Sequence, residues 1–306
     1  MQNKLSVNIG KLKLKNPVMV ASGTFGYAEE FKDFIDLKQL GAIVTKTITL
    51  KPRQGNPSPR TCETPSGMLN SIGLENPGME GFIKEKLPAL QKIGVPLIIS
   101  ISSEDNPQEL VILARQLDKI KTVAAVELNI SCPNLQKTKL ISQDAHSTYE
   151  VVKEVRKVTH KIIITKLSPN VACIADIAQA AESAGSDAVS LINTLPGLCI
   201  DVEKRMPKLA CVTGGLSGPA VRPVAVRMVW EVFQKVKIPI IGMGGIMNTC
   251  DALEFMLAGA TAVSIGTANF VNPRTAIEII SGLKKYCQEH NIDSIKKLTG
   301  SLKCQN

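Results

Sequence analysis

The stretch at residues 238–268, IPIIGMGGIMNTCDALEFMLAGATAVSIGTA, decides the fold class. It begins and ends with short apolar runs that lead into glycine. Near-continuous apolar runs of this length are typical of parallel strands buried on both faces. The segment between them predicts a helix that stops at Gly259, because glycine commonly follows the last helical turn. The stretch therefore predicts two parallel strands joined by a helix.

The same unit recurs along the whole chain, since strand-like runs alternate with helical patterns. The candidate strands are NPVMVAS (16–22), AIVTKT (42–47), VPLIISIS (95–102), AAVELN (124–129), KIIITKL (161–167), DAVSLIN (187–193), IPIIGMGG (238–245) and TAVSIGTA (261–268). Eight strands alternating with helices predict an α/β fold, a (β/α)8 TIM barrel that forms a single domain over residues 1–306. An open doubly wound sheet is disfavoured, because no G-x-G-x-x-G motif follows the first strand.

Extended loops are expected after strands 2, 4 and 6. Residues 50–78 follow the second strand, the loop with Cys132 and His146 follows the fourth, and residues 195–219 follow the sixth. Long structured loops in a compact domain usually bind ligands or cover a site, so we expect these loops at the active site. The N-terminal LSVNIGKLKL (5–14) predicts a small hairpin that closes the barrel floor.

Composition narrows the function classes. The N-terminus lacks the apolar centre of a signal peptide and no apolar run is long enough to span a bilayer, so we expect a cytoplasmic protein. The eight cysteines form no C-x-x-C pair and no Cys/His cluster, which predicts no metal site on this chain. A net charge of +9 with only 4% aromatic residues favours an anionic ligand or acidic partner over nucleic acid.

Polar residues stand at the strand ends, where barrels of this kind place their active sites. Gly244, Gly245, Gly266 and Thr267 end the last two strands and predict a phosphate site of exposed backbone N–H groups. The alternative is that these glycines only make tight strand-to-helix turns.

Two lysines, Lys46 and Lys166, end the second and fifth strands. A lysine buried at a barrel mouth is costly unless it meets an anion or an electron-rich ring. It can form a Schiff base, bind phosphate, or stabilise negative charge on a cofactor or intermediate. The alternative is a lysine that reaches out over the rim to solvent.

Amides and one thiol complete the candidate site. Asn70, Asn129, Asn134 and Asn193 suit a small polar ligand that has both C=O and N–H groups. Cys132 lies just after the fourth strand and can act as a nucleophile or a proton acceptor, with a structural cysteine as the alternative.

Several long motifs resemble one known family. They are SGTFGY, ETPSGMLNSIGLENPG, ELNISCPN, KLSPN, NTLPG, TGGLSGPAVRP, IIGMGG and SIGTANF, and they extend from about residue 16 to about residue 273. The chain resembles the catalytic subunit of class 1B dihydroorotate dehydrogenase, a flavin enzyme of pyrimidine biosynthesis. The loop LQKTKLISQDAHST after Cys132 departs from the glycine-rich stretch that is usual in this family.

The resemblance implies roles for individual residues. FMN would contact Ser22, Lys46, Thr47, Ser100, Asn129, Lys166, Ile192, Gly218, Gly244, Gly245, Gly266 and Thr267, with Ser100 standing where the family usually has asparagine. The pyrimidine would be held by Lys46, Asn70, Ser71, Ile72, Gly73, Leu74, Asn129, Asn193 and Thr194. Cys132 would be the catalytic base.

The resemblance also implies an activity and a partner. Dihydroorotate would be oxidised to orotate in de novo pyrimidine (UMP) synthesis, with the hydride passing to FMN. Electrons would then reach NAD through a partner subunit with FAD and a 2Fe–2S cluster, around a homodimer core of a heterotetramer. Two alternatives stay open: a flavin enzyme for another dihydropyrimidine, and a flavin-free barrel subunit.

Overall fold

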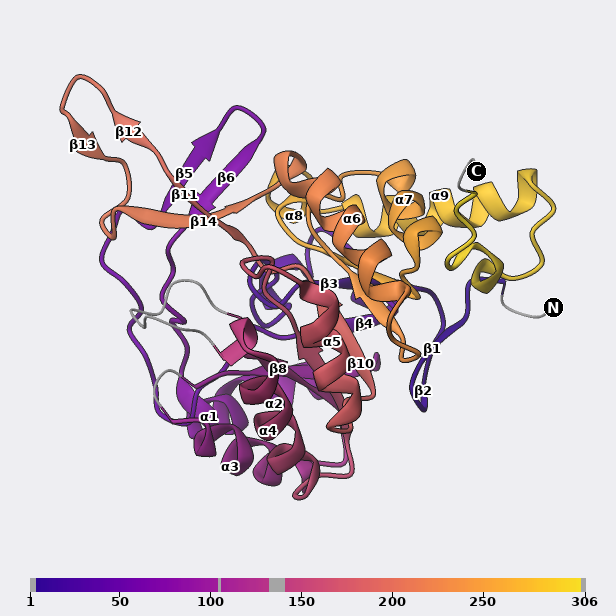
Figure 1. The fold of residues 1–306 in the computed structure, drawn as a ribbon, viewed down its shortest axis with the longest axis horizontal. Coiled ribbons are helices and arrows are strands. Elements are labelled where there is room, and N and C mark those ends of the chain that lie inside the picture. The colour runs from indigo at the N-terminus through magenta and orange to yellow at the C-terminus, as the bar shows by residue number, and fades with distance from the viewer. Residues whose placement is uncertain (1–3, 104–105, 132–140, 304–306) are drawn as a thin grey trace.

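Eight parallel strands close into a barrel at the centre of the molecule (Figure 1), whose computed structural model describes residues 4–103, 106–131 and 141–303. Each strand pairs with the next in chain order, and β16 closes the ring on β3. The strands are β3 (Val18–Val20), β4 (Ala42–Val44), β7 (Leu97–Ile101), β8 (Val123–Asn129), β9 (Ile162–Lys166), β10 (Ala188–Leu191), β15 (Ile240–Gly242) and β16 (Ala262–Ile265). Each lies within one of the eight apolar runs or overlaps it, so the barrel prediction is confirmed.

Helices pack around the outside of the barrel (Figure 1). They are α1 (Gly78–Gly81), α2 (Leu87–Gln91), α3 (Gln108–Asp118), α4 (Ala145–Arg156), α5 (Ile174–Ser183), α6 (Arg222–Phe233), α7 (Thr249–Ala258), α8 (Ala268–Val271) and α9 (Thr275–Glu289). A π-helical stretch, Phe82–Lys86, joins α1 to α2, while only 3-10 turns connect β3 to β4. Within the described ranges, no helix is long and apolar enough to cross a membrane.

The barrel strands are buried on both faces, inside the barrel and beneath the helices. All five residues of β7 and all four of β16 are buried, which explains their continuous apolar sequence. Phe255 of α7 is fully buried against Gly242 of β15, where an added Cβ would lie 2.5 Å from the ring atom Cδ1. Glycine at this position therefore lets α7 pack close to the strand. Gly259 ends α7 with a φ of 128°, as its position in the sequence predicts.

A hairpin lies at the floor of the barrel. β1 (Val7–Ile9) pairs antiparallel with β2 (Leu12–Leu14) around Gly10, whose φ is 54°. An added Cβ on Gly10 would lie 3.3 Å from the Cβ of Asp187, the residue just before β10. Since the amino ends of the strands form the floor, the predicted position of this hairpin is confirmed.

A second sheet lies at the opposite end of the barrel and is built from two of the predicted long loops. β5 (Thr61–Thr64) and β6 (Gly67–Asn70) follow β4, whereas β11 (Leu195–Leu198) and β14 (Thr213–Ser217) follow β10. They pair antiparallel in the order β11-β14-β6-β5, here named the mouth sheet. A further hairpin of β12 (Ile200–Asp201) and β13 (Met206–Pro207) projects away from the barrel (Figure 1). Residues 132–140 of the predicted loop after the fourth barrel strand lie outside the described residues. The prediction that His146 belongs to this loop is wrong, because α4 already begins at Ala145.

Candidate active site

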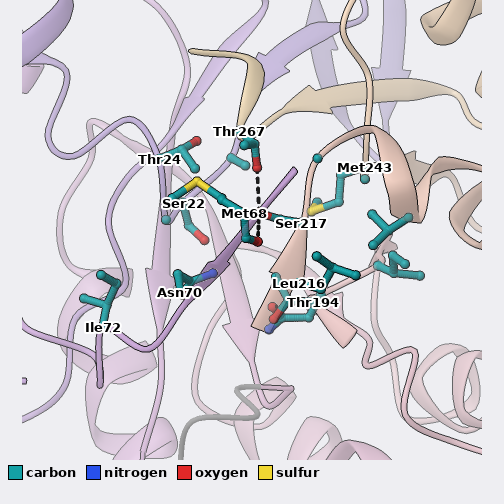
Figure 2. A pocket seen from close by; sticks show the side chains of 18 of the residues that line it. Ser22, Thr24, Met68, Asn70, Ile72, Thr194, Leu216, Ser217, Met243 and Thr267 are labelled. Atoms are coloured by element: carbon teal, nitrogen blue, oxygen red, sulfur yellow. Dashed lines mark hydrogen bonds between the residues drawn. The ribbon is translucent and has the colours of Figure 1, made fainter. Parts of the chain in front are cut away.

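A pocket of about 220 Å³ lies between the carboxyl ends of the barrel strands and the mouth sheet (Figure 2). From the barrel it is lined by Ser22, Lys46, Asn129 and Lys166, among others. From the mouth sheet it is lined by Thr61, Met68, Asn70, Leu216 and Ser217. The carboxyl ends of the barrel strands thus form the base of the pocket, and the two long loops cover it.

The pocket carries positive charge without a matching carboxylate. Among its described lining residues there are two lysines and no Asp or Glu. Lys166 is 7% exposed, and its Nζ contacts the Ser22 hydroxyl at 3.4 Å. In the part of the chain that the structure describes, neither Lys46 nor Lys166 forms an ion pair within 4.0 Å. Because a buried cation without an anion is unfavourable, the pocket suits an anionic or electron-rich ligand.

Burial also changes the acidity of Lys46. Loss of hydration lowers the pKa of its ammonium group, and the nearby Arg60 guanidinium acts in the same direction. The carboxylates of Glu75 and Glu30 oppose this by raising the pKa. The pKa of Lys46 is lowered overall. An anion bound in the pocket would oppose this by stabilising the protonated form.

Hydrogen bonds fix the two amides at the ends of β8 and β10. The Asn129 amide donates to Thr47 Oγ1 at 3.1 Å, and Asn193 donates to Ser131 Oγ at 2.9 Å. Ser131 in turn donates to Asn129 Oδ1 at 3.2 Å. The Thr47 hydroxyl also lies 2.9 Å from that of Ser100, which is fully buried on β7. The network fixes the Asn129 and Asn193 side chains at the wall of the pocket.

Gly23 and Gly266 leave open space beside their backbone at the pocket wall. An added Cβ on Gly23 would meet nothing within 4 Å, and one on Gly266 would meet only Ala21 Cβ at 3.8 Å. Gly244 and Gly245 have φ values of 124° and 77°, which side-chain-bearing residues rarely adopt. These loops all line the pocket, so a ligand can approach their backbone closely.

The segment after β6 is held from outside the pocket. The Asn70 amide donates to the Gly215 carbonyl at 3.2 Å. Ser71 is only 2% exposed and receives a 3.0 Å hydrogen bond from the Asn56 amide. Asn56 is contacted in turn by the Arg60 guanidinium, which also pairs with Glu75. These contacts set the path of the chain through residues 70–75.

Most of the residues singled out from sequence meet in this pocket. All of the cofactor candidates line it except Ser100, which reaches it only through Thr47. All of the pyrimidine candidates line it except Ser71, whose hydroxyl faces Asn56. Cys132 and Asn134 lie outside the described residues.

Several lining residues were not anticipated from sequence. Thr24, Met68 and Ser217 project into the pocket (Figure 2), and Thr61 also lines it. The Ser217 hydroxyl accepts a 2.8 Å hydrogen bond from Thr267, and the Thr24 hydroxyl is buried without a partner among the described atoms. The alternation of residues along β5 and β6 could have indicated Thr61 and Met68, had those segments been recognised as strands.

Comparisons with known proteins agree with this geometry. A family model described as "Dihydroorotate dehydrogenase" matches residues 4–287. Proteins named "Dihydroorotate dehydrogenase B (NAD(+)), catalytic subunit" are similar over nearly their whole length. That of Geotalea uraniireducens is 53% identical over 97% of this chain and 98% of its own. That of Trichlorobacter lovleyi is 54% identical over 99% of both chains, and that of Thermoanaerobacter pseudethanolicus is 52% identical over 98% of this chain and 99% of its own. The chain therefore belongs to the dihydroorotate dehydrogenase family.

Proposed function

We propose that this chain is the catalytic subunit of an NAD-linked dihydroorotate dehydrogenase, which oxidises dihydroorotate to orotate in pyrimidine biosynthesis. The observation that carries the proposal is the pocket lined by the buried Lys166 and the half-buried Lys46, with no carboxylate among its described lining residues, in a chain 50–54% identical to relatives of that name. Orotate is a planar anion with alternating C=O and N–H groups. Lysine ammonium groups and asparagine amides match that chemistry.

The pocket also fits FMN, the cofactor of this proposed activity. Open space beside Gly23 and Gly266 leaves room for a bulky group, and the glycine backbone of the last two strands suits its phosphate. We assign its binding to Ser22, Lys46, Thr47, Asn129, Lys166, Ile192, Gly218, Gly244, Gly245, Gly266 and Thr267. Ser100 would act indirectly, because its hydroxyl holds Thr47. FMN, when bound, accepts the hydride that dihydroorotate loses.

The pyrimidine is assigned to the side of the pocket beneath the mouth sheet. Lys46, Asn129, Asn193 and Thr194 would bind its polar edge from the barrel. Asn70, Ile72, Gly73 and Leu74 would cover it from the second loop, with Ser71 supporting that loop from outside. The mouth sheet covers this side of the pocket, and the exclusion of water by a bound ligand would strengthen the electrostatic contacts of the two lysines.

Proton transfer is assigned to Cys132. Its thiolate would take the proton from C5 of dihydroorotate, and the positive charge of the pocket would favour the thiolate form. The assignment rests on the position of Cys132 directly after the fourth barrel strand, since its side chain lies outside the described residues.

The partner is assigned from the same family resemblance. We propose an electron-transfer subunit that carries FAD and a 2Fe–2S cluster and passes electrons on to NAD, bound around a homodimer of this chain in the cytoplasm. The names of the relatives, which include "catalytic subunit", support the existence of a partner.

An anaerobic visible spectrum of the purified chain tests the proposal. The protein should be yellow, and the flavin absorbance should bleach when dihydroorotate is added but not when dihydrouracil is added. A colourless protein that takes up no FMN would refute the cofactor assignment. Yellow protein that bleaches only with dihydrouracil would keep the cofactor and overturn the substrate.

A further inference from the structure

The loop that follows β15, residues 243–248 and here named the β15 loop, is held by a carboxylate that lies outside the pocket. Residues 243–247 all line the pocket. Asn248 then caps the amino end of α7, where its side chain accepts a 3.1 Å hydrogen bond from Asp251 N. Asp251 lies in the first turn of α7, is 3% exposed, and is not among the described residues that line the pocket.

One oxygen of the Asp251 carboxylate binds the backbone of the β15 loop. Oδ2 accepts hydrogen bonds from Met247 N at 2.8 Å and from Asn248 N at 3.2 Å. Hydrogen bonds to a charged acceptor are the stronger kind, so the carboxylate fixes the path of the loop where it enters α7. The N–H groups of Gly244, Gly245 and Ile246 form no hydrogen bond with any described residue. They are the donors that the loop can offer to an anion.

The other oxygen of Asp251 meets an arginine at the start of α6. The Arg222 guanidinium donates through Nη1 to Asp251 Oδ1, and its Nε lies 3.3 Å from Glu254 Oε2. The ion pair of Arg222 with Asp251 therefore joins the amino ends of α6 and α7. The positive charge of Arg222 also offsets the negative charge of the carboxylate, which would otherwise repel an anion bound at the β15 loop.

Close packing connects this ion pair to the pocket wall. An added Cβ on Gly245 would lie 2.8 Å from Arg222 Cβ and 2.8 Å from the Gly218 carbonyl oxygen. Gly218 lines the pocket from the segment that precedes α6. A shift of α6 relative to α7 would therefore displace both glycines at the wall.

We propose that Asp251 is a positioning residue for the phosphate of a bound flavin nucleotide, with Arg222 as its charge partner. This inference rests on the proposed function, in which the phosphate binds the glycine backbone after the last two barrel strands. Neither side chain lines the pocket among the described residues, so both act through the backbone of the β15 loop. The pair thus determines how strongly the chain prefers FMN over riboflavin, which has the same ring system and no phosphate.

Flavin titration tests the proposal. The full chain, freed of flavin, is titrated with FMN and with riboflavin. In Asp251→Asn the side-chain N–H₂ must face either Arg222 or the loop N–H groups, and both are donors. The affinity for FMN should therefore fall by roughly tenfold, whereas the affinity for riboflavin should not change. Asp293→Asn, which removes a surface ion pair with Lys297, is the matched control and should change neither affinity.

A double variant tests the pairing itself. With Arg222→Gln added to Asp251→Asn, the asparagine oxygen can accept from the loop while its N–H₂ donates to the glutamine oxygen. The double variant should recover most of the lost FMN affinity. Failure to recover would overturn the role of Arg222 as the partner. Unchanged FMN affinity in Asp251→Asn, or equal losses for FMN and riboflavin, would overturn the proposal.

Arg222→Gln alone gives a second test. The Arg222 side chain is 31% exposed, so this variant remains informative if Asp251→Asn does not fold. It leaves the charge of Asp251 without its partner. FMN should bind several-fold more weakly than to the native chain, with a larger difference at low salt than at high salt, and riboflavin should bind as before. An unchanged preference for FMN over riboflavin would contradict the proposal.

Hydrogen exchange of the flavin-free chain separates this inference from the proposed function. The amides of Met247 and Asn248 should exchange roughly tenfold faster in Asp251→Asn than in the native chain, because they lose their acceptor. If these amides lose protection but the native chain binds no FMN, the proposed function fails while the support of the β15 loop stands. Unchanged exchange in a chain that binds FMN would overturn the positioning role of Asp251.

Discussion

Lys46 is a half-buried lysine at the pocket wall that forms no ion pair with any described carboxylate. Its pKa is lowered by loss of hydration, so it gains most from an anionic ligand. Lys46→Ala should weaken binding of both FMN and orotate by roughly tenfold each, since under the proposed function each ligand would lose one charge-assisted hydrogen bond. Fluorescence titration with FMN, and orotate titration of the holoprotein, would measure this.

Lys51→Ala is a matched control for Lys46, because the Lys51 side chain is exposed. It should leave both affinities unchanged. Equal affinities for Lys46→Ala and the native chain would remove Lys46 from the site.

Cys132→Ser tests the proposed proton acceptor. A serine hydroxyl is a far weaker base at neutral pH, so reduction of bound flavin by dihydroorotate should slow by about 10²-fold or more. The FMN content should stay the same. Rapid-mixing absorbance of the anaerobic holoprotein gives the rate, and Cys173→Ser, which changes an exposed cysteine, gives the control. Reduction at the native rate would show that another group takes the proton.

The sequence predicted the residues that line the pocket better than the residues that hold those side chains in place. Lys46 and Lys166 could be predicted because a buried charge has few explanations other than a ligand. The resemblance implies ligand contacts for Ser100 and Ser71, and in the structure their hydroxyls form hydrogen bonds with Thr47 and Asn56. The sequence does not distinguish a serine whose hydroxyl faces the pocket from one whose hydroxyl faces a neighbouring side chain. That difference depends on how the segments lie against one another in the fold.

Arg60 holds the loop after the second barrel strand (residues 50–78) in place. Its guanidinium bonds the carbonyls of Asn56 and Gln54 and pairs with Glu75, and Asn56 holds Ser71. Arg60→Gln should raise the KM for dihydroorotate by roughly tenfold while FMN content stays constant, because residues 70–75 lose their support. Steady-state kinetics with a soluble electron acceptor would measure it.

Two further substitutions sharpen the Arg60 experiment. Arg60→Lys keeps the positive charge but loses the planar guanidinium group. A raised KM in this variant would show that the geometry of the guanidinium, and not its charge alone, holds the loop. Arg227→Gln removes a surface ion pair with Glu231 on α6 and should not change KM. A similar rise in KM for Arg227→Gln and Arg60→Gln would refute the positional role of Arg60.

Asp118 joins the end of α3 to the segment before β9. Burial alone would raise the pKa of its carboxyl group, but hydrogen bonds from Thr159 Oγ1 and His160 N, both 2.7 Å, outweigh this and lower it. A carboxyl with a lowered folded pKa stabilises the fold above its unfolded pKa, and this contribution is lost as the pH falls.

Asp118→Asn should therefore lower the free energy of unfolding at neutral pH by up to about 1 kcal/mol, because the site is partly solvated. The difference should narrow as the pH falls below about 4. Urea unfolding over a pH series checks this, with the exposed Asp33→Asn as the control. A difference independent of pH would contradict the linkage.

At the scale of elements, the barrel could be predicted and the mouth sheet could not. The barrel strands are continuous apolar runs, such as LIISI in β7. The strand β6 has the sequence GMLN, with a single buried residue, and it pairs with β14, far along the chain. Asn70 and Gly215, which bond across this pair, are 145 positions apart. The local sequence pattern of β6 or of β14 does not predict that these two distant strands pair with one another.

The stability of the whole molecule depends on close packing between the barrel and the helices around it, such as the contact of Phe255 with Gly242. Phe255→Ala should cost about 3–5 kcal/mol, because it opens a cavity between α7 and β15. Phe34→Ala, at a side chain that is 56% exposed, should cost less than about 0.5 kcal/mol. Urea midpoints of the two variants measure the contrast. Equal losses would show that α7 is not part of the cooperative core.

The pairing of β6 with β14 also sets an order of events on the ribosome. Domains fold as their residues emerge, amino end first, yet the outer edge of β6 stays without its partner until β14 has been synthesised. Thr267 and Phe270, which complete the wall of the pocket, emerge later still. A nascent chain thus has no complete pocket for a flavin until most of it has been translated. Cofactor loading is consequently one of the last steps in the biogenesis of this protein.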